Sequence, residues 1–249
     1  MLSYAVLIVA GLLAGALNAV AGGGTFLSFP ALVWAGVPPV AANATATLAA
    51  LPGYLGSTWA FRQDIAASHR LPPLLVIGTA ALGGGLGAFL LLATPGEVFS
   101  GIVPWLLGFA TVIFALGPRI TALLTRRGLG KPGVVAVTLT LMIVTSYGGY
   151  FNGGVGILLL AALGLLGMSN LKEMNGLKNL MSSILSLISV TIYVAAGLIA
   201  WKHALVMGLA CAAGGYLGAA LFRRVSKPAV LRVFITLVGT VMTIVFLVR

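Results

Sequence analysis

The chain has 249 residues, of which 60% are hydrophobic and 7% are charged, and its formal net charge is +11. Ordinary globular proteins carry about 25% charged residues, so a chain this poor in charge cannot cover a water-exposed surface. Its composition predicts an all-α polytopic membrane protein whose partner is the lipid bilayer. The basic residues lie in short connections between apolar runs, where they orient helices, and this argues against nucleic acid as a partner.

Ten apolar runs, each bounded by charge, proline or glycine, follow one another along the chain. The first five cover residues 2–21, 25–36, 39–61, 71–94 and 101–117, and the last five cover residues 133–150, 154–168, 174–198, 204–222 and 229–248. Most are near the roughly 20 residues that a helix needs to span a bilayer, which predicts about 8–10 transmembrane helices. No basic residue precedes the first run, so we expect a retained helix rather than a signal peptide. The two shortest runs, 25–36 and 154–168, are expected to be tilted, re-entrant or half-helices.

The two sets of runs are copies of each other. The segment from Gly15 through Asn18 to Gly22 aligns with the segment from Gly149 through Asn152 to Gly156. Residues 42–47 align in the same way with residues 174–179, and residues 82–88 align with residues 213–219. We therefore expect a single transmembrane domain, 1–249, made of repeat one (1–117), a basic cytoplasmic linker (118–132) and repeat two (133–249). Matching interrupted segments in the two halves of a membrane protein point to a transporter with its binding site at the repeat interface.

The basic residues predict how the repeats are oriented. If each repeat crosses the membrane five times, the connections 62–70, 118–132 and 223–228 lie on one side, and the other side keeps only Lys202 and Arg249. Four crossings per repeat would divide the charges almost evenly. The positive-inside bias therefore favours five crossings per repeat, inverted repeats, both termini outside the cytoplasm and a place in the inner (plasma) membrane. Glycine-rich faces at Gly83–Gly87 and Gly214–Gly218 suit close helix packing, either within one protomer or in a homodimer.

One apolar stretch, Gly15 to Gly53, is unusually rich in glycine, proline, asparagine and threonine, and it holds no charge. Each interior Gly disfavours a helix by about 1 kcal/mol and each Pro by about 3 kcal/mol. In lipid, non-helical backbone survives only where protein buries it or where it lines a water-filled cavity. This stretch therefore predicts a broken helix followed by a polar-faced helix, deep inside the protein and close to the substrate.

Groups that usually carry catalysis or bind metals are missing from the apolar runs. The acidic residues Asp64, Glu97 and Glu173 all lie in or beside connections, and His69 and His203 lie in separate loops. The glycine string at Gly22–Gly24 lacks the Lys-Ser/Thr pair of a phosphate loop, and no carboxylate pair is placed for acid–base work. We therefore expect no enzyme activity, no metal and no cofactor.

Uncharged polar residues and one lysine remain on the broken repeats. Asn43 and Thr47 are four residues apart and share one helix face, and the aligned face of repeat two carries Asn175, Lys178 and Asn179. Backbone N–H groups at a helix break, with the positive end of the helix dipole behind them, form an anion site. The predicted site for a small anionic substrate comprises Asn18, Gly22, Gly23, Gly24, Thr25, Asn43, Thr47, Asn152, Gly153, Gly154, Gly156, Asn175, Lys178 and Asn179.

Each of these residues also has a structural interpretation. Asn and Thr in membrane helices often only form hydrogen bonds across a helix interface, and Lys178 is close enough to a helix end to reach the interface with its amine. The occurrence of the pattern in both repeats favours the functional interpretation.

These motifs resemble those of the TauE/SafE family, also called the sulfite exporter or anion permease family. The resemblance rests on the stretch AGALNAVAGGGTFLSFPALVWAGVPPVAANATATLAALPGYLGSTWAFR in the first half, and on YGGYFNGGVGILLLAALGLLGMSNLKEMNGLKNLMSSI and GYLGAALFRRV in the second. It implies a permease or exporter of small sulfur-containing anions: sulfite, sulfoacetate, thiosulfate or other organosulfonates. The glycine-rich element of the family corresponds to Gly22–Gly24, and its asparagine-bearing helix starts correspond to Asn43 and Asn175, with Lys178 in the second copy.

Transport by alternating access around a midplane anion site is the leading hypothesis. Three alternatives remain open at this point: an uptake permease for small carboxylates or other anions, a passive anion channel, and a membrane scaffold without a pore.

Overall fold

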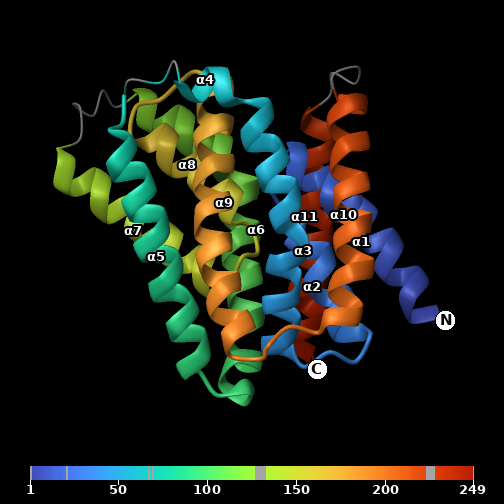
Figure 1. Ribbon diagram of the computed structural model, residues 1–249. Coiled ribbons are helices and arrows are strands. Elements are labelled where there is room, and N and C mark those ends of the chain that lie inside the picture. The colour runs from blue at the N-terminus through green and yellow to red at the C-terminus, as the bar shows by residue number, and fades with distance from the viewer. Residues whose placement is uncertain are drawn as a thin grey trace.

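The computed structural model describes residues 2–20, 22–66, 68, 70–126, 133–222 and 228–248, and within them the regular structure is entirely helical (Figure 1). Repeat one forms α1 (Leu2–Val20), α2 (Thr25–Trp34), α3 (Pro39–Ala60), α4 (Arg62–Ala66), α5 (Pro73–Ala93) and α6 (Gly96–Arg126). Repeat two forms α7 (Val134–Tyr150), α8 (Val155–Leu165), α9 (Leu171–Ala195), α10 (Trp201–Phe222) and α11 (Pro228–Val248). The prediction of an all-α polytopic membrane protein is confirmed.

The apolar runs coincide with helices to within three residues at each end, with one exception. Helix α6 begins at Gly96 and continues to Arg126, although its apolar run covers only 101–117. Residues 118–126 are therefore helix rather than linker, since Ala, Leu and Arg favour helix whether or not the surface is apolar. The remainder of the predicted linker, 127–132, and most of the connection 223–228 lie outside the described residues. The short helix α4 was not predicted.

Helix lengths divide the elements into two kinds. The described residues contain four helical segments that are long and apolar enough to cross a membrane: Leu2–Ala19, Pro73–Ala93, Gly96–Ile113 and Lys172–Ala195. Helices α2 and α8 have 10 and 11 residues, which is about 15 Å of helix against a hydrocarbon core of about 30 Å. They are half-helices, and α2 lies in the lower half of the molecule and α8 in the upper half (Figure 1).

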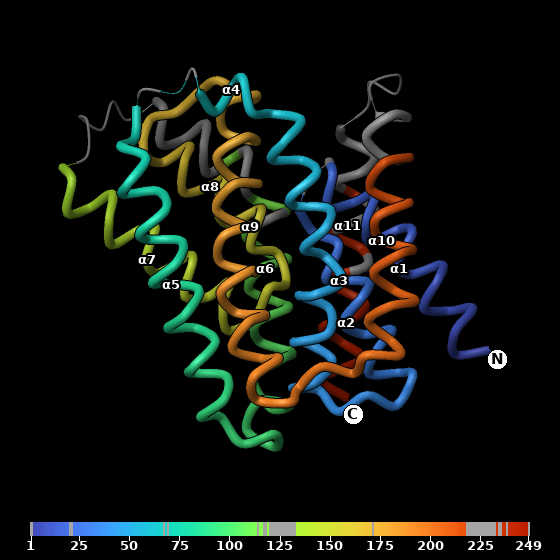
Figure 2. Tube along the Cα trace, in the orientation of Figure 1, coloured from blue at the N-terminus to red at the C-terminus, as the bar shows by residue number. Residues whose placement is uncertain are grey.

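The first two helices of each repeat form a hairpin. Helices α1 and α7 run obliquely inward from opposite edges of the molecule, and α2 and α8 turn back toward the end from which the hairpin came (Figure 1). The prediction of five full crossings per repeat is therefore wrong for the runs 25–36 and 154–168. The chain after each hairpin goes back and forth between the two ends as long helices (Figure 2). A hairpin that enters and returns leaves the sidedness of every connection unchanged, so the basic connections are still expected on one side.

Helices of the two repeats pack against each other in matching pairs. Helix α1 packs on α10, and its counterpart α7 packs on α5. In the same way, α3 packs on α10, and its counterpart α9 packs on α5. Helices α3 and α9 also pack on each other. Helix α6 likewise packs on its counterpart α11, with Gly108 beside Thr243 and Thr111 beside Gly239. The order of these contacts means that α6 and α11 are antiparallel, as two inverted copies would be.

Glycines let the backbones of the paired helices touch. A Cβ atom on Gly15 of α1 would lie 2.0 Å from the carbonyl oxygen of Cys211 in α10, and a Cβ atom on Gly87 of α5 would lie 2.1 Å from the carbonyl oxygen of Ser146 in α7. Gly83 lies equally close to Thr145. These glycine faces therefore serve packing within one chain.

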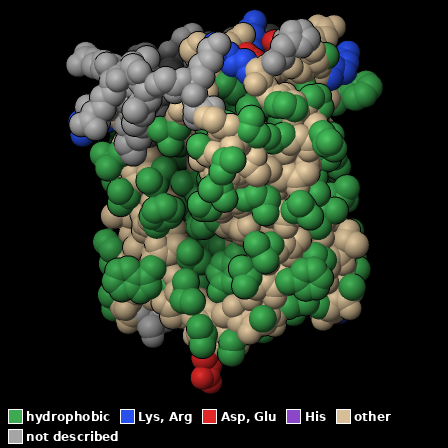
Figure 3. Space-filling view, turned by 90° about the vertical axis from the view of Figure 1, so that its left-hand side faces the viewer, with side chains coloured by type: hydrophobic (Ala, Val, Ile, Leu, Met, Phe, Trp, Pro, Cys, Tyr) green, Lys and Arg blue, Asp and Glu red, His purple; other side chains and the backbone are tan. Residues whose placement is uncertain are grey.

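Charged side chains lie at both ends of the molecule. Helix α4, with Arg62 and Asp64, lies at the upper end of Figure 1, and the first turn of α6, which contains Glu97, lies at the lower end. On the face shown in Figure 3, hydrophobic side chains cover the middle and charged side chains appear only toward the two ends. This is the pattern of a surface that lies in lipid between two aqueous phases.

Candidate functional site

The two helix breaks meet at the centre of the molecule. A Cβ atom on Gly22, after α1, would lie 2.8 Å from the Cα atom of Gly156, and a Cβ atom on Gly156 would lie 2.9 Å from the Cα atom of Gly22. Gly22 and Gly154 have φ angles of +79° and +77°, a left-handed conformation that glycine adopts without steric strain. Because Gly22 and Gly156 are aligned in the repeats, their contact marks the point where the two hairpins join.

Asn18 holds the first break together. Its Oδ1 atom accepts a hydrogen bond of 2.8 Å from the N–H group of Gly24, and the N–H group of Gly22 donates to the carbonyl oxygen of Leu17 at 3.1 Å. Two of the N–H groups predicted to bind an anion are thus already paired within the chain. Asn18 is a structural residue of this break in the described conformation.

The aligned residue of repeat two, Asn152, has a different environment. Its Nδ2 atom lies 3.3 Å from Oγ of Ser186 in α9, while its Oδ1 atom is buried without a hydrogen-bond partner. The carbonyl oxygen of Gly153, the next residue, accepts a hydrogen bond from the hydroxyl of Tyr147 at 2.8 Å. This second break is therefore tied to α7 and α9 by its polar groups.

Asn43 and Thr47 are buried on α3, but they differ in how their polar atoms are satisfied. The Nδ2 atom of Asn43 donates to the carbonyl oxygen of Tyr150 at 2.9 Å, and its Oδ1 atom has no partner. The hydroxyl of Thr47 donates to the carbonyl oxygen of Asn43 at 2.9 Å, within its own helix. Asn43 is thus linked to repeat two through Tyr150, whereas Thr47 has no unsatisfied atom to offer.

Helix α9 contributes the largest group of unpaired polar atoms. Lys178, Asn179 and Ser182 are fully buried, and the Lys178 amine, both amide atoms of Asn179 and the Ser182 hydroxyl lack hydrogen-bond partners. Lys178 and Asn179 precede Ser182 by four and three positions, so both side chains lie on the same helix face as Ser182. Asn175 lies one turn before them on the same helix.

Lys178 reaches the point where the hairpins join. A Cβ atom on Gly156 would lie 3.4 Å from Cδ of Lys178, so the lysine stem passes directly beside the contact between Gly22 and Gly156. An unpaired ionised amine in an apolar environment is strongly unfavourable. In the described residues, no hydrogen-bond partner compensates for the burial of this amine.

Buried polar atoms without partners are rare in folded proteins, and each calls for an explanation. In the part of the chain that the structure describes, they belong to Thr25, Asn43, Tyr54, Asn152, Lys178, Asn179 and Ser182. Five of these seven residues belong to the predicted site, and Tyr54 and Ser182 were missed. Ser182 could have been found from its spacing, since it follows Lys178 by four residues on a polar helix face.

Side chains that commonly bind metal ions do not cluster in the described part of the chain. Among the described residues there is no group of three or more His, Cys, Asp or Glu side chains that could hold a metal ion. His203 stacks on the ring of Tyr4 with 6.0 Å between ring centroids, and His69 lies outside the described residues. The central polar atoms are hydroxyls, amides and one amine, which together suit an oxyanion better than a metal ion.

Comparison with known proteins places this arrangement in a family. The family model "Sulfite exporter TauE/SafE" matches residues 7–246. A probable membrane transporter protein, ORF9, from Sinorhizobium sp is 32% identical over 219 residues, which are 86% of this chain and 80% of the relative. A probable membrane transporter protein from Haemophilus influenzae is 28% identical over 96% of this chain and 92% of the relative. The probable membrane transporter protein YfcA from Escherichia coli is 28% identical over 96% of this chain and 87% of its own length. No solved structure matches the chain significantly.

Proposed function

The chain belongs to the sulfite exporter TauE/SafE family of membrane transporters, and from that premise we propose that it moves small sulfur-containing anions such as sulfite, thiosulfate or organosulfonates across the inner membrane. The protein would act as a secondary transporter, with export as its direction, and not as an enzyme. The observation that carries this proposal is the set of unpaired, buried polar atoms beside the joined hairpins.

The chemistry of these atoms supports an anion as the substrate. The Lys178 amine supplies compensating charge, and the Asn179 amide and the Ser182 hydroxyl supply hydrogen-bond donors on the same helix face. A bound oxyanion would pair with groups that otherwise remain unsatisfied. Hydrogen bonds to charged groups are worth about 1.5–3 kcal/mol each, which is enough to make occupancy favourable at moderate concentrations.

The repeats support alternating access as the mechanism. Corresponding helices pair across the two repeats, α6 and α11 run antiparallel, and the aligned glycines Gly22 and Gly156 touch. In an inverted repeat, two such halves rock about a site near the bilayer midplane. We place both termini outside the cytoplasm, and the connections 62–70, 118–132 and 223–228 inside it, because the basic residues gather there.

Thermal stabilisation of the purified protein by a panel of anions tests the proposal. A ligand at 100 times its Kd that binds only the folded state adds about 2.7 kcal/mol, which corresponds to a rise in Tm of about 5–10 °C for a chain of this size. We expect a rise with sulfite, thiosulfate or a sulfonate, and we expect Lys178→Met to abolish it. Lys202→Met is the matched control, because Lys202 is exposed at the end of the molecule.

Other outcomes would point elsewhere. A rise with carboxylates alone would replace the sulfur anions by the carboxylate alternative. If none of the anions raises the Tm and the protein moves no anion into liposomes, a membrane scaffold is favoured. Flux that does not saturate and is not stimulated by anion on the opposite side would indicate a channel.

A further inference from the structure

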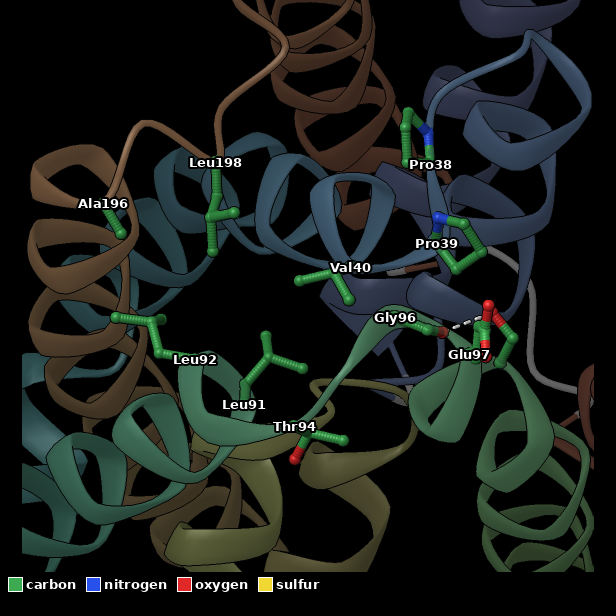
Figure 4. Close-up of a pocket in the computed structure, with 11 residues that line it drawn as sticks. Pro38, Pro39, Val40, Leu91, Leu92, Thr94, Gly96, Glu97, Ala196 and Leu198 are labelled. Atoms are coloured by element: carbon green, nitrogen blue, oxygen red, sulfur yellow. Dashed lines mark hydrogen bonds between the residues drawn. The ribbon is translucent and has the colours of Figure 1, made fainter.

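We propose that the cavity at the end of the molecule opposite α4 is the water-filled access path to the anion site, and that Tyr150 is the gate between them. The inference rests on the proposed transport function. The cavity has a volume of about 740 Å³ and lies between the start of α3, the connection from α5 to α6 and the connection from α9 to α10 (Figure 4).

The position of the cavity suits an access path. Pro39 and Val40 of α3, Leu92 and Thr94 near the end of α5, and Leu198 between α9 and α10 line it (Figure 4). All these segments are helix ends on the same side of the molecule, so the cavity opens toward water rather than toward the lipid-facing middle. One water molecule occupies about 30 Å³ in the liquid, so the space is large enough for a small anion and many waters of hydration.

The lining of the cavity suits passage rather than tight binding. Most lining residues are apolar, and the charged side chain among them is Glu97, which repels an anion. Buried polar groups without partners, which would hold an anion, lie instead in the interior on α9. The cavity is therefore separate from the candidate site.

Tyr150 connects the cavity to the site through two hydrogen bonds. Its hydroxyl donates to Oγ1 of Thr94, a lining residue, at 3.3 Å, and its carbonyl oxygen accepts from Nδ2 of Asn43 at 2.9 Å. Its ring packs edge-on against Phe99, which is fully buried, with 5.7 Å between the ring centroids. Tyr150 thus lies between the cavity and Asn43, and a movement of its side chain away from Thr94 opens the way inward.

At the opposite end of the molecule, the described residues of the corresponding connection make close contacts. In the repeat alignment, the connection from α9 to α10, which lines the cavity, corresponds to the connection from α3 to α5, which contains α4. Helix α4 packs on α9 there, with Ile65 against Gly176. Ser68 donates to Glu173, Arg70 donates to the carbonyl oxygen of Gly167, and the hydroxyls of Thr58 and Ser183 lie 3.0 Å apart. The described residues thus link α3, α4 and α9 at this end, whereas the cavity lies at the other end, a difference that one of the two states of alternating access would show.

Cysteine accessibility tests the access path. Cys211 is the single cysteine, so Cys211→Ala gives a background in which Leu198→Cys can be labelled alone by a membrane-impermeant sulfonate-bearing thiol reagent. We expect Leu198→Cys to react from the membrane face opposite to the one from which Arg62→Cys in α4 reacts. Leu209→Cys is the matched control, because Leu209 is 72% exposed on α10 but lies away from the helix ends. A thiol in lipid is not ionised, so it should react slower by an order of magnitude or more.

The gate is tested by removing one hydrogen bond from either side. Tyr150→Phe and Thr94→Val each remove the bond between the hydroxyls and leave the backbone contact with Asn43. Each change should speed the labelling of Thr47→Cys by about 2- to 10-fold, the range for loss of one neutral hydrogen bond. The double variant should show no further gain. Thr138→Val is the matched control, because the Thr138 hydroxyl bonds only within its own helix on an exposed surface.

Failure of the inference and failure of the proposed function are distinguishable, because labelling needs no transport. If Leu198→Cys reacts only from the face of Arg62→Cys, or no faster than Leu209→Cys, the cavity is not an access path. If Thr47→Cys is labelled equally in all gate variants, Tyr150 is not the gate. Anion binding that is absent in the thermal test while labelling behaves as expected would overturn the transport of sulfur anions and leave the water path standing.

Discussion

At the scale of single residues, the two repeats contribute unequally to the centre of the molecule. In the alignment, Lys178 corresponds to Ala46 and Ser182 to Ala50, and Asn179 corresponds to Thr47, whose hydroxyl already has a partner in its own helix. Unsatisfied donors are therefore concentrated on α9. If an anion binds there as proposed, we expect repeat two to supply the charge and most of the hydrogen bonds.

Ser182→Ala is expected to raise the stability of the ligand-free protein and to weaken anion binding. The substitution removes a buried hydroxyl that has no partner, a penalty of about 1–3 kcal/mol, and it also removes a donor to the ligand. Anion affinity should fall by about 10-fold or more for a bond to a charged group. Thermal unfolding with and without sulfite measures both effects. Thr47→Ala is the control, and equal losses of affinity in the two variants would contradict the unequal contribution of the repeats.

Gly156→Ala is expected to destabilise the protein by about 1–3 kcal/mol, the usual result of overpacking. The new methyl group would lie 2.9 Å from the backbone of Gly22 and close to the Lys178 stem, so the two hairpins would have to separate. Gly78→Ala in α5 is the control, because nothing lies within 4 Å of the added Cβ atom there. A loss of thermal stability that is no greater in Gly156→Ala than in Gly78→Ala would show that the hairpin contact is not tight.

The sequence analysis selected five of the residues whose buried polar atoms lack partners. Thr25, Asn43, Asn152, Lys178 and Asn179 all carry unpaired buried atoms, because polar residues on aligned positions of apolar helices are conspicuous. A structural role was one of two interpretations of Asn18, and the sequence could not decide between them, since a side chain that holds a helix break and one that binds a ligand look alike in a sequence. Tyr54 and Ser182 were missed because tyrosine and serine are common in membrane helices and carry little signal alone.

At the scale of the helices, hydropathy defines most boundaries and hydrogen bonding defines the rest. Helix α9 begins at Leu171 and not at 174, because Oδ1 of Asn170 accepts a bond of 3.1 Å from the N–H group of Lys172 and caps the helix. The Asn170–Glu173 spacing resembles a capping box. Because its residues are polar, a search for apolar runs does not detect it. Helix α6 continues to Arg126, beyond the end of its apolar run at 117, because helical backbone hydrogen bonds do not require an apolar surface.

Gly87→Ala is expected to separate α5 from α7. The added methyl group would lie 2.1 Å from the carbonyl oxygen of Ser146, whereas two residues earlier on α5 a Cβ atom on Gly85 would meet Ile188 at 3.6 Å, an ordinary contact. Gly85→Ala is therefore the matched control. We expect a lower Tm for Gly87→Ala by several degrees, about 2–4 °C for each kcal/mol lost in a chain of this size. Equal Tm values for the two variants would contradict the close packing of these backbones.

At the scale of the whole molecule, the apolar runs alone do not determine the number of crossings. Apolar runs of 12 and 15 residues, such as 25–36 and 154–168, fit a tilted span, a re-entrant segment and a half-helix equally well. The contact between Gly22 and Gly156 depends on residues more than a hundred positions apart, and no local pattern reveals it. The distribution of basic residues is insensitive to this difference, because a hairpin and two crossings return the chain to the same side.

A reporter fused after Arg249 tests the orientation. With the C-terminus outside the cytoplasm, alkaline phosphatase fused there should be active in a bacterial host, and a fluorescent protein that matures only in the cytoplasm should stay dark. Fusion after Arg126, at the end of α6, should give the reverse pattern. The same result for both fusion points would exclude the arrangement in which the two ends of the molecule lie in different compartments.

Helices of the first repeat pack on helices of the second, and this has a consequence for biosynthesis. Leu12 of α1 and Gly214 of α10 touch, yet 214 − 12 = 202 positions separate them in the chain. At a synthesis rate of about 5–20 residues per second, α1 is made roughly 10–40 s before its partner. Throughout that interval, its bare glycine backbone faces either lipid or the insertion machinery. The first half of this protein therefore cannot reach its final form until the ribosome has nearly finished the second.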